Sequence, residues 1–119
     1  MYQKAKELRE VGARVDLLAH SDGNLACVAA MRGDWTEALD VFGRVVQFWT
    51  TLGDVRMIAI GKLNQAECLI ELFEGGEDPS GKKVYEVSAR RSLDEAQALI
   101  PNDGISAIDK DHERLVSRL

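Results

Sequence analysis

The sequence predicts an all-α protein built from antiparallel helix hairpins. Apolar residues recur every three or four positions along most of the 119-residue chain, as they do on one face of a helix. No stretch shows the sustained two-residue alternation that is typical of a strand. The two prolines, Pro79 and Pro101, both lie in the last third, so no proline interrupts a helix before residue 79.

The N-terminal half is expected to form three helices separated by glycine-containing turns. Gly12 is interpreted as the first turn. Gly33 and Asp34 mark the second, because glycine can end a helix and aspartate can cap the next one. The helices expected here cover residues 2–10, 14–32 and 35–50.

The C-terminal half is expected to form three more helices. Gly53 and Asp54 repeat the glycine-aspartate turn, and the glycine-rich stretch 75–81 is the clearest loop of the chain. A further break between helices is expected to begin at Pro101. The helices expected here cover residues 54–74, 82–100 and 104–118.

The chain also contains an internal repeat. When the sequence is shifted along itself, Asn24 falls on Asn64, and a longer shift places Ala38 on Ala89. The difference between the two shifts indicates an insertion, which falls at residues 75–81. The insertion forms either a tolerated surface bulge or a specific contact element. The repeating unit is thus a helix hairpin that occurs twice, over residues 14–51 and 54–101.

The residues of the first unit follow a known pattern of small and aromatic positions: Asn24, Leu25, Ala26, Ala29, Gly33, Asp34, Trp35, Ala38, Phe42 and Val45. This pattern resembles a tetratricopeptide repeat. The second unit lacks the Gly-Asp-aromatic turn but keeps Asn64, Ala66, Leu69, Ala89, Leu93, Ala96 and Pro101. The Leu-Gly-Asp at 52–54 resembles the subclass with repeats of about 40 residues. The resemblance implies a single domain over residues 1–119, folded as a short right-handed superhelical stack with the helices 2–10 and 104–118 at its ends.

Composition excludes several classes of function. The net charge is −5, and no basic face of the kind that binds nucleic acid is evident. The longest uncharged apolar stretch, residues 45–52, is too short to cross a membrane. The chain has only two cysteines, and they form no Cys-x-x-Cys motif, so no redox or zinc motif is indicated. The expected location is a reducing compartment, cytoplasmic or nuclear.

No catalytic, metal or cofactor site is expected. His20 lies two helical turns before Cys27, about 10 Å away by helix rise, which is too far for proton transfer. Both cysteines, Cys27 and Cys68, are therefore interpreted as small buried side chains. His20 and His112 each lack enough neighbouring ligands for a metal site.

The repeat resemblance implies a partner-binding surface on the first helix of each unit. In that family the position of Asn24 and Asn64 faces a concave groove, where an amide can bond to a peptide backbone. Hydrogen bonding of these amides to neighbouring helices is the open alternative. The lysine and arginine of the family's carboxylate clamp are missing, so an acidic C-terminal peptide is not the expected ligand. The expected surface comprises His20, Asn24, Cys27, Met31, Ile60, Asn64, Glu67 and Glu71.

Two functions follow from these observations. The first is a non-catalytic protein–protein interaction module, a scaffold or adaptor that binds a peptide or helix of its partner in the groove. The second is a structural spacer or oligomerisation segment of a longer helical-repeat protein, which self-associates through its end helices.

Overall fold

The computed structural model describes the backbone of residues 2–76, 78–100 and 107–119. Within the first helix, side chains are described at residues 14, 17 and 18 and from residue 20 onward; the side chain of residue 107 is also outside the description. The described chain contains five helices and no strand, which confirms the all-α prediction. They are α1 (Tyr2–Met31), α2 (Trp35–Leu52), α3 (Val55–Gly75), α4 (Pro79–Leu99) and α5 (Ala107–Val116).

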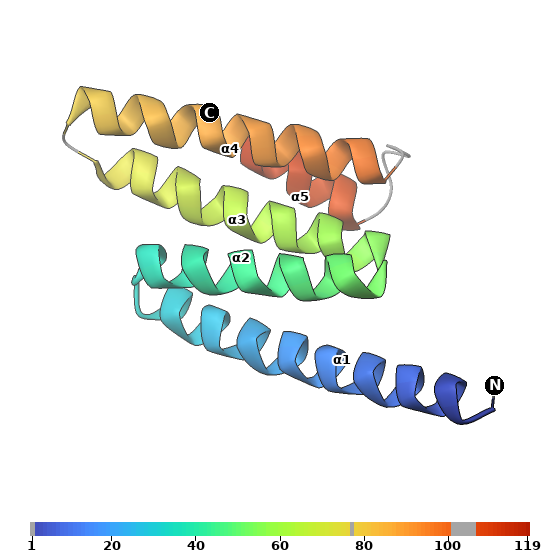
Figure 1. Ribbon diagram of the computed structural model, residues 1–119. Coiled ribbons are helices and arrows are strands. Elements are labelled where there is room, and N and C mark those ends of the chain that lie inside the picture. Colours follow the sequence, from blue (N-terminus) through green and yellow to red (C-terminus); the bar gives the residue numbers. More distant parts are fainter. Residues whose placement is uncertain (1, 77, 101–106) are drawn as a thin grey trace.

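Helices α1 to α4 lie side by side, each antiparallel to the next, and α5 packs against α3 and α4 (Figure 1). None of the helices in the described chain combines the length and the apolar character that a membrane span requires. The order of the helices places α2 between α1 and α3, and this arrangement creates the site described below.

Glycine and aspartate form both of the short turns that the sequence predicted. Gly33 and Gly53 adopt φ values of 77° and 72°, a left-handed conformation that glycine reaches without strain. The backbone N–H of Met57 donates to the Asp54 carboxylate at 3.1 Å, and Asp34 caps α2 in the same way. These caps let consecutive helices reverse direction in a very short turn.

The expected turn at Gly12 is wrong, because α1 runs without interruption from Tyr2 to Met31. One helix therefore replaces the two that were expected over residues 2–10 and 14–32. A glycine inside a helix costs only about 1 kcal/mol relative to alanine, so favourable neighbours can carry a helix through it.

The expected loop at residues 75–81 is present but shorter than predicted. Helix α3 continues to Gly75 and α4 already begins at Pro79, whose fixed φ suits the first position of a helix. The Asp78 side chain accepts a hydrogen bond from the backbone N–H of Ser80 at 3.2 Å and caps α4. At this end the α3–α4 hairpin projects past the α1–α2 turn (Figure 1).

The last expected helix is present in part. Helix α5 covers Ala107–Val116 within the expected range 104–118. The beginning of that range and the break at Pro101 lie outside the described residues.

The core consists of small side chains at helix contacts and larger ones between them. Several described alanines are fully buried: Ala26, Ala38, Ala59, Ala66 and Ala89. Among the larger side chains, Ile70, Leu93 and Leu115 join α3, α4 and α5 into one cluster. A particularly close approach of two helices occurs at Gly61 of α3, where an added Cβ would lie 2.6 Å from a methyl group of Val46 on α2.

Candidate functional site

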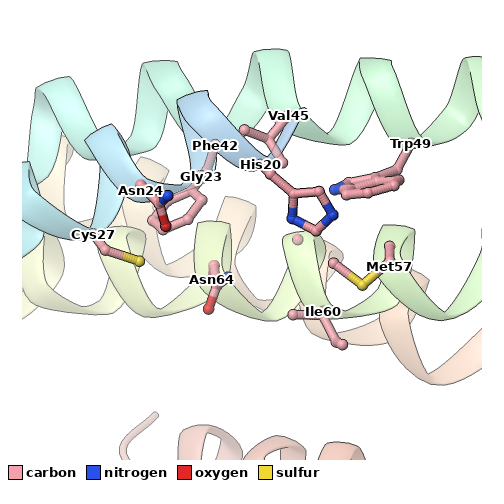
Figure 2. A pocket seen from close by; sticks show the side chains of 11 residues that line it. His20, Gly23, Asn24, Cys27, Phe42, Val45, Trp49, Met57, Ile60 and Asn64 are labelled. Atoms are coloured by element: carbon pink, nitrogen blue, oxygen red, sulfur yellow. The ribbon is translucent and has the colours of Figure 1, made fainter. Parts of the chain in front are cut away.

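A cavity of about 150 Å³ opens between α1 and α3, against one face of α2 (Figure 2). Its floor comes from α2, and its walls come from the two flanking helices. The residues that line it are His20, Gly23, Asn24, Cys27, Phe42, Val45, Trp49, Met57, Ile60, Gly61 and Asn64. We call this site the α1–α3 groove.

The floor of the groove is apolar and rigid. Phe42, Val45 and Trp49 follow one another at intervals of three and four positions, so they share one face of α2. Each is at most 6% exposed. Because these side chains also pack in the core, their positions are fixed before any ligand arrives.

Two glycines, Gly23 and Gly61, lie in the walls of the groove. A Cβ added at Gly23 of α1 would meet nothing within 4 Å, so any larger side chain there would project into free space. At Gly61 a Cβ would collide with Val46, so glycine lets α3 approach α2 closely. Larger side chains at these positions would fill the groove or push its walls apart.

The rim of the groove carries Asn24 and Asn64, two of the residues that were expected to bind a partner. Asn24 stands on α1 and Asn64 on the facing wall, α3 (Figure 2). Neither amide forms a hydrogen bond with another residue in the part of the chain that the structure describes. The alternative in which they bond to neighbouring helices is therefore not observed there, and each amide offers a donor and an acceptor to the groove.

An aromatic pair closes one end of the groove. The rings of His20 and Trp49 meet edge to face, with their centroids 5.1 Å apart and their planes at 78° (Figure 2). Trp49 is buried, and the neighbouring Phe48 is half-buried. A ligand in the groove would therefore change the surroundings of the Trp49 indole.

Farther along α3, its acidic side chains pair with Arg114 of α5 and with Arg118, which lies just beyond that helix. Arg118 contacts Glu71 at 2.8 Å and Glu74 at 2.7 Å, and Arg114 contacts Glu67 at 3.3 Å. The hydrogen bond from the Arg118 guanidinium lowers the pKa of Glu74, and the same carboxylate raises the pKa of Arg118. Glu67 and Glu71, expected to bind a partner, are thus already paired within the chain and do not line the groove.

The other predicted residues divide between the groove and the surface. His20, Asn24, Cys27, Ile60 and Asn64 line the groove together. Met31 does not line it and stands 87% exposed at the end of α1.

Sequence reasoning missed most of the remaining lining, namely Phe42, Val45, Trp49, Met57 and Gly61. Phe42 and Val45 had been interpreted only as positions of the repeat pattern. Their spacing on one face of α2 was the available signal.

The two cysteines differ in their surroundings. Cys68 is 1% exposed, and burial, with the nearby Glu67 carboxylate, raises the pKa of its thiol to about 12. It therefore stays protonated near neutral pH. Cys27 is exposed on the wall of the groove, so the expectation that both cysteines are buried is wrong for Cys27.

Comparison of the chain with protein-family models, with curated proteins and with solved structures gave no significant match.

Proposed function

We propose that this chain is a non-catalytic protein-interaction module of the tetratricopeptide-repeat type, a scaffold or adaptor whose α1–α3 groove binds a peptide segment of a partner. One observation carries the proposal: an open apolar cavity is flanked on facing helices by two amides that have no described hydrogen-bond partner. The two amides occupy the same position in the two repeat units, which supports a shared role.

The volume of the cavity limits the size of the ligand side chain that the groove can hold. A cavity of about 150 Å³ holds one benzene molecule, so the groove accepts one aromatic or branched aliphatic side chain. Asn24 and Asn64 can then bond to the peptide units on either side of this anchor. The lining contains no carboxylate or ammonium group, so the anchor itself is uncharged.

A random peptide library presented to the immobilised chain tests this function. Binding of selected peptides is measured through the fluorescence of Trp49, with Trp35 replaced by phenylalanine so that only one indole reports. We expect selected peptides to share one large apolar residue. The double variant Asn24→Ala/Asn64→Ala should bind them about 5- to 150-fold more weakly, because two hydrogen bonds are worth about 1–3 kcal/mol together.

A groove-filling variant and its control make the test decisive. Gly23→Met places a flexible apolar side chain in the open space above the floor and should abolish binding. Gly43→Met adds the same side chain to the opposite side of α2, away from the groove, and should leave binding unchanged. Peptides that bind Gly23→Met as well as the original chain, or a library that yields no binder, would contradict the proposal.

A further inference from the structure

The outer side of α1 carries an apolar face that no described part of the chain covers. Arg14 and Arg32 stand at its two ends, and both side chains are exposed. At 100° per residue, the arginines and the apolar positions between them fall within an arc of about 100° around the helix axis. We call this surface the outer face of α1. Its apolar side chains, each at least 43% exposed, are Leu17, Leu18, Leu25 and Val28.

The position of α1 at the edge of the helix array explains why this face is open. Helix α1 packs extensively against α2 alone, and its far side faces away from the other helices (Figure 1). Of the α1 residues that line the groove, Asn24 comes nearest to the outer face, about 70° from the centre of the arc. His20, Gly23 and Cys27 lie more than about 100° from that centre. A partner seated on the outer face therefore leaves the α1–α3 groove accessible.

The spacing of the apolar residues fits a helix as the partner. Leu18 and Leu25 are seven residues apart, and Val28 follows three residues later. This is the a and d spacing of a heptad, by which one helix packs along another. A contiguous exposed patch of such residues is typical of an interaction surface.

The charges on the outer face determine which kind of helix it accepts. Arg14 and Arg32 are 18 residues apart, which is five helical turns, so they point in the same direction about 27 Å apart along the axis. Neither guanidinium has an ion-pair or hydrogen-bond partner in the part of the chain that the structure describes. The only carboxylate among the described side chains of α1 is Asp22, which pairs with Arg44 of α2 at 3.6 Å. The face is thus basic, although the chain carries a net charge of −5.

This charge pattern disfavours a second copy of α1 as the occupant. In an antiparallel pair centred on the face, Arg14 would lie opposite the partner's Arg32. In a parallel pair in register, each arginine would lie opposite its own counterpart. Like charges that face each other across an interface weaken binding, so the complementary helix carries acidic residues at these two places.

We propose that the outer face of α1 binds an amphipathic helix of a partner protein, whose apolar stripe is flanked by two Asp or Glu residues about 18 positions apart. The apolar stripe covers Leu18, Leu25 and Val28 and supplies most of the affinity. The two carboxylates meet Arg14 and Arg32 and determine which helix is chosen.

Two synthetic helical peptides that differ only in charge test the proposal. Both carry leucine at the a and d positions of three heptads; one has glutamate at two positions 18 residues apart, and the other has lysine there. Fluorescence anisotropy of the dye-labelled peptides measures their binding to the whole chain. We expect the glutamate peptide to bind at least 10-fold more tightly, with a preference that weakens as salt is added. The double variant Arg14→Glu/Arg32→Glu should prefer the lysine peptide instead.

Single variants assign the binding to this face. Leu25→Asn should weaken binding of the glutamate peptide at least 10-fold, because it removes a leucine from the centre of the contact. Val84→Asn is the matched control, since Val84 is 63% exposed on α4, and it should leave binding unchanged. Gly23→Met, which fills the groove, should also leave binding unchanged, so this result does not depend on the function of the groove.

Four outcomes would overturn the proposal. They are equal binding of the two peptides by the original chain, binding that survives Leu25→Asn, binding that Gly23→Met abolishes, and self-association of the chain that Leu25→Asn abolishes. The last outcome would assign the outer face to a second copy.

Discussion

Replacing Gly61 by alanine should destabilise the protein, although alanine is the better helix former. On propensity alone, glycine to alanine within a helix adds about 1 kcal/mol to the free energy of unfolding. The contact between α2 and α3 opposes this gain. The new Cβ would lie 2.6 Å from Cγ2 of Val46, whereas ordinary contacts of this kind are 3.4–4 Å.

Relief of this clash is costly because Val46 cannot turn away easily. It is 8% exposed, and β-branched side chains in helices have essentially one rotamer. Overpacking of this kind costs about 1–3 kcal/mol. The net loss in the free energy of unfolding should therefore be about 1 kcal/mol.

Urea denaturation followed by far-UV circular dichroism measures this loss. Gly43→Ala on α2 is the matched control, since its new Cβ would make only an ordinary contact of 3.6 Å with Gln65. We expect this control to stabilise the protein by up to about 1 kcal/mol. In the double variant Gly61→Ala/Val46→Ala the clash disappears. The double variant should therefore lose less free energy of unfolding than the two single variants lose together, by about 1 kcal/mol or more. Stabilisation by Gly61→Ala alone would refute the reasoning.

Three further predictions concern caps, ion pairs and thiols. Asp54→Ala should lower the free energy of unfolding by about 1 kcal/mol, measured in urea, because it removes the N-cap of α3; an unchanged stability would contradict the capping role. Arg118 holds the pKa of Glu74 below its ordinary value of 4.5, so this pair stabilises the fold above that pH, and its contribution is lost as the pH falls through the folded-state pKa. The stability difference between the original chain and Glu74→Gln should accordingly shrink on acidification in thermal melts, and a difference that grows would be inconsistent with the pair. Iodoacetamide should modify Cys27 rapidly and Cys68 only after opening of the structure, and mass spectrometry of digests would reveal equal rates if this assignment is wrong.

Local turn chemistry explains which parts of the fold the sequence could predict. Gly33 and Gly53 adopt left-handed conformations and are followed by aspartate caps, so their turns depend on two adjacent residues. The prediction at Gly12 failed because a helix depends on its whole length, and one unfavourable residue does not decide it. Pro79 was interpreted as part of a loop, yet at the first position of a helix proline is favourable, and only the cap at Asp78 distinguishes the two roles.

Two residues on the rim of the groove, Asn24 and Asn64, were among those expected from the sequence, whereas the floor of the groove was not expected. Asn24 and Asn64 lie on the facing helices α1 and α3 (Figure 2). The role of Gly61 depends on which side chain of α2 it meets, and sequence spacing does not supply that contact. The pairing of Glu71 with Arg118 was equally unpredictable, because the last helix did not match the repeat pattern and its position along α3 was unknown.

Because α3 lies at the centre of the helix array, it should be the last helix to unfold and an early one to form. Helix α3 packs against α2, α4 and α5, and its Cys68 side chain lies in the cluster that α1 and α2 form. Its amide hydrogens should therefore exchange with solvent only when most of the structure opens, whereas those of α5 can exchange in a smaller opening. All extensive contacts join helices that are consecutive in the chain or separated by a single helix. A chain with such local connectivity has little loop entropy to overcome, so refolding should be fast, and α3 should be the element on which the two hairpins assemble.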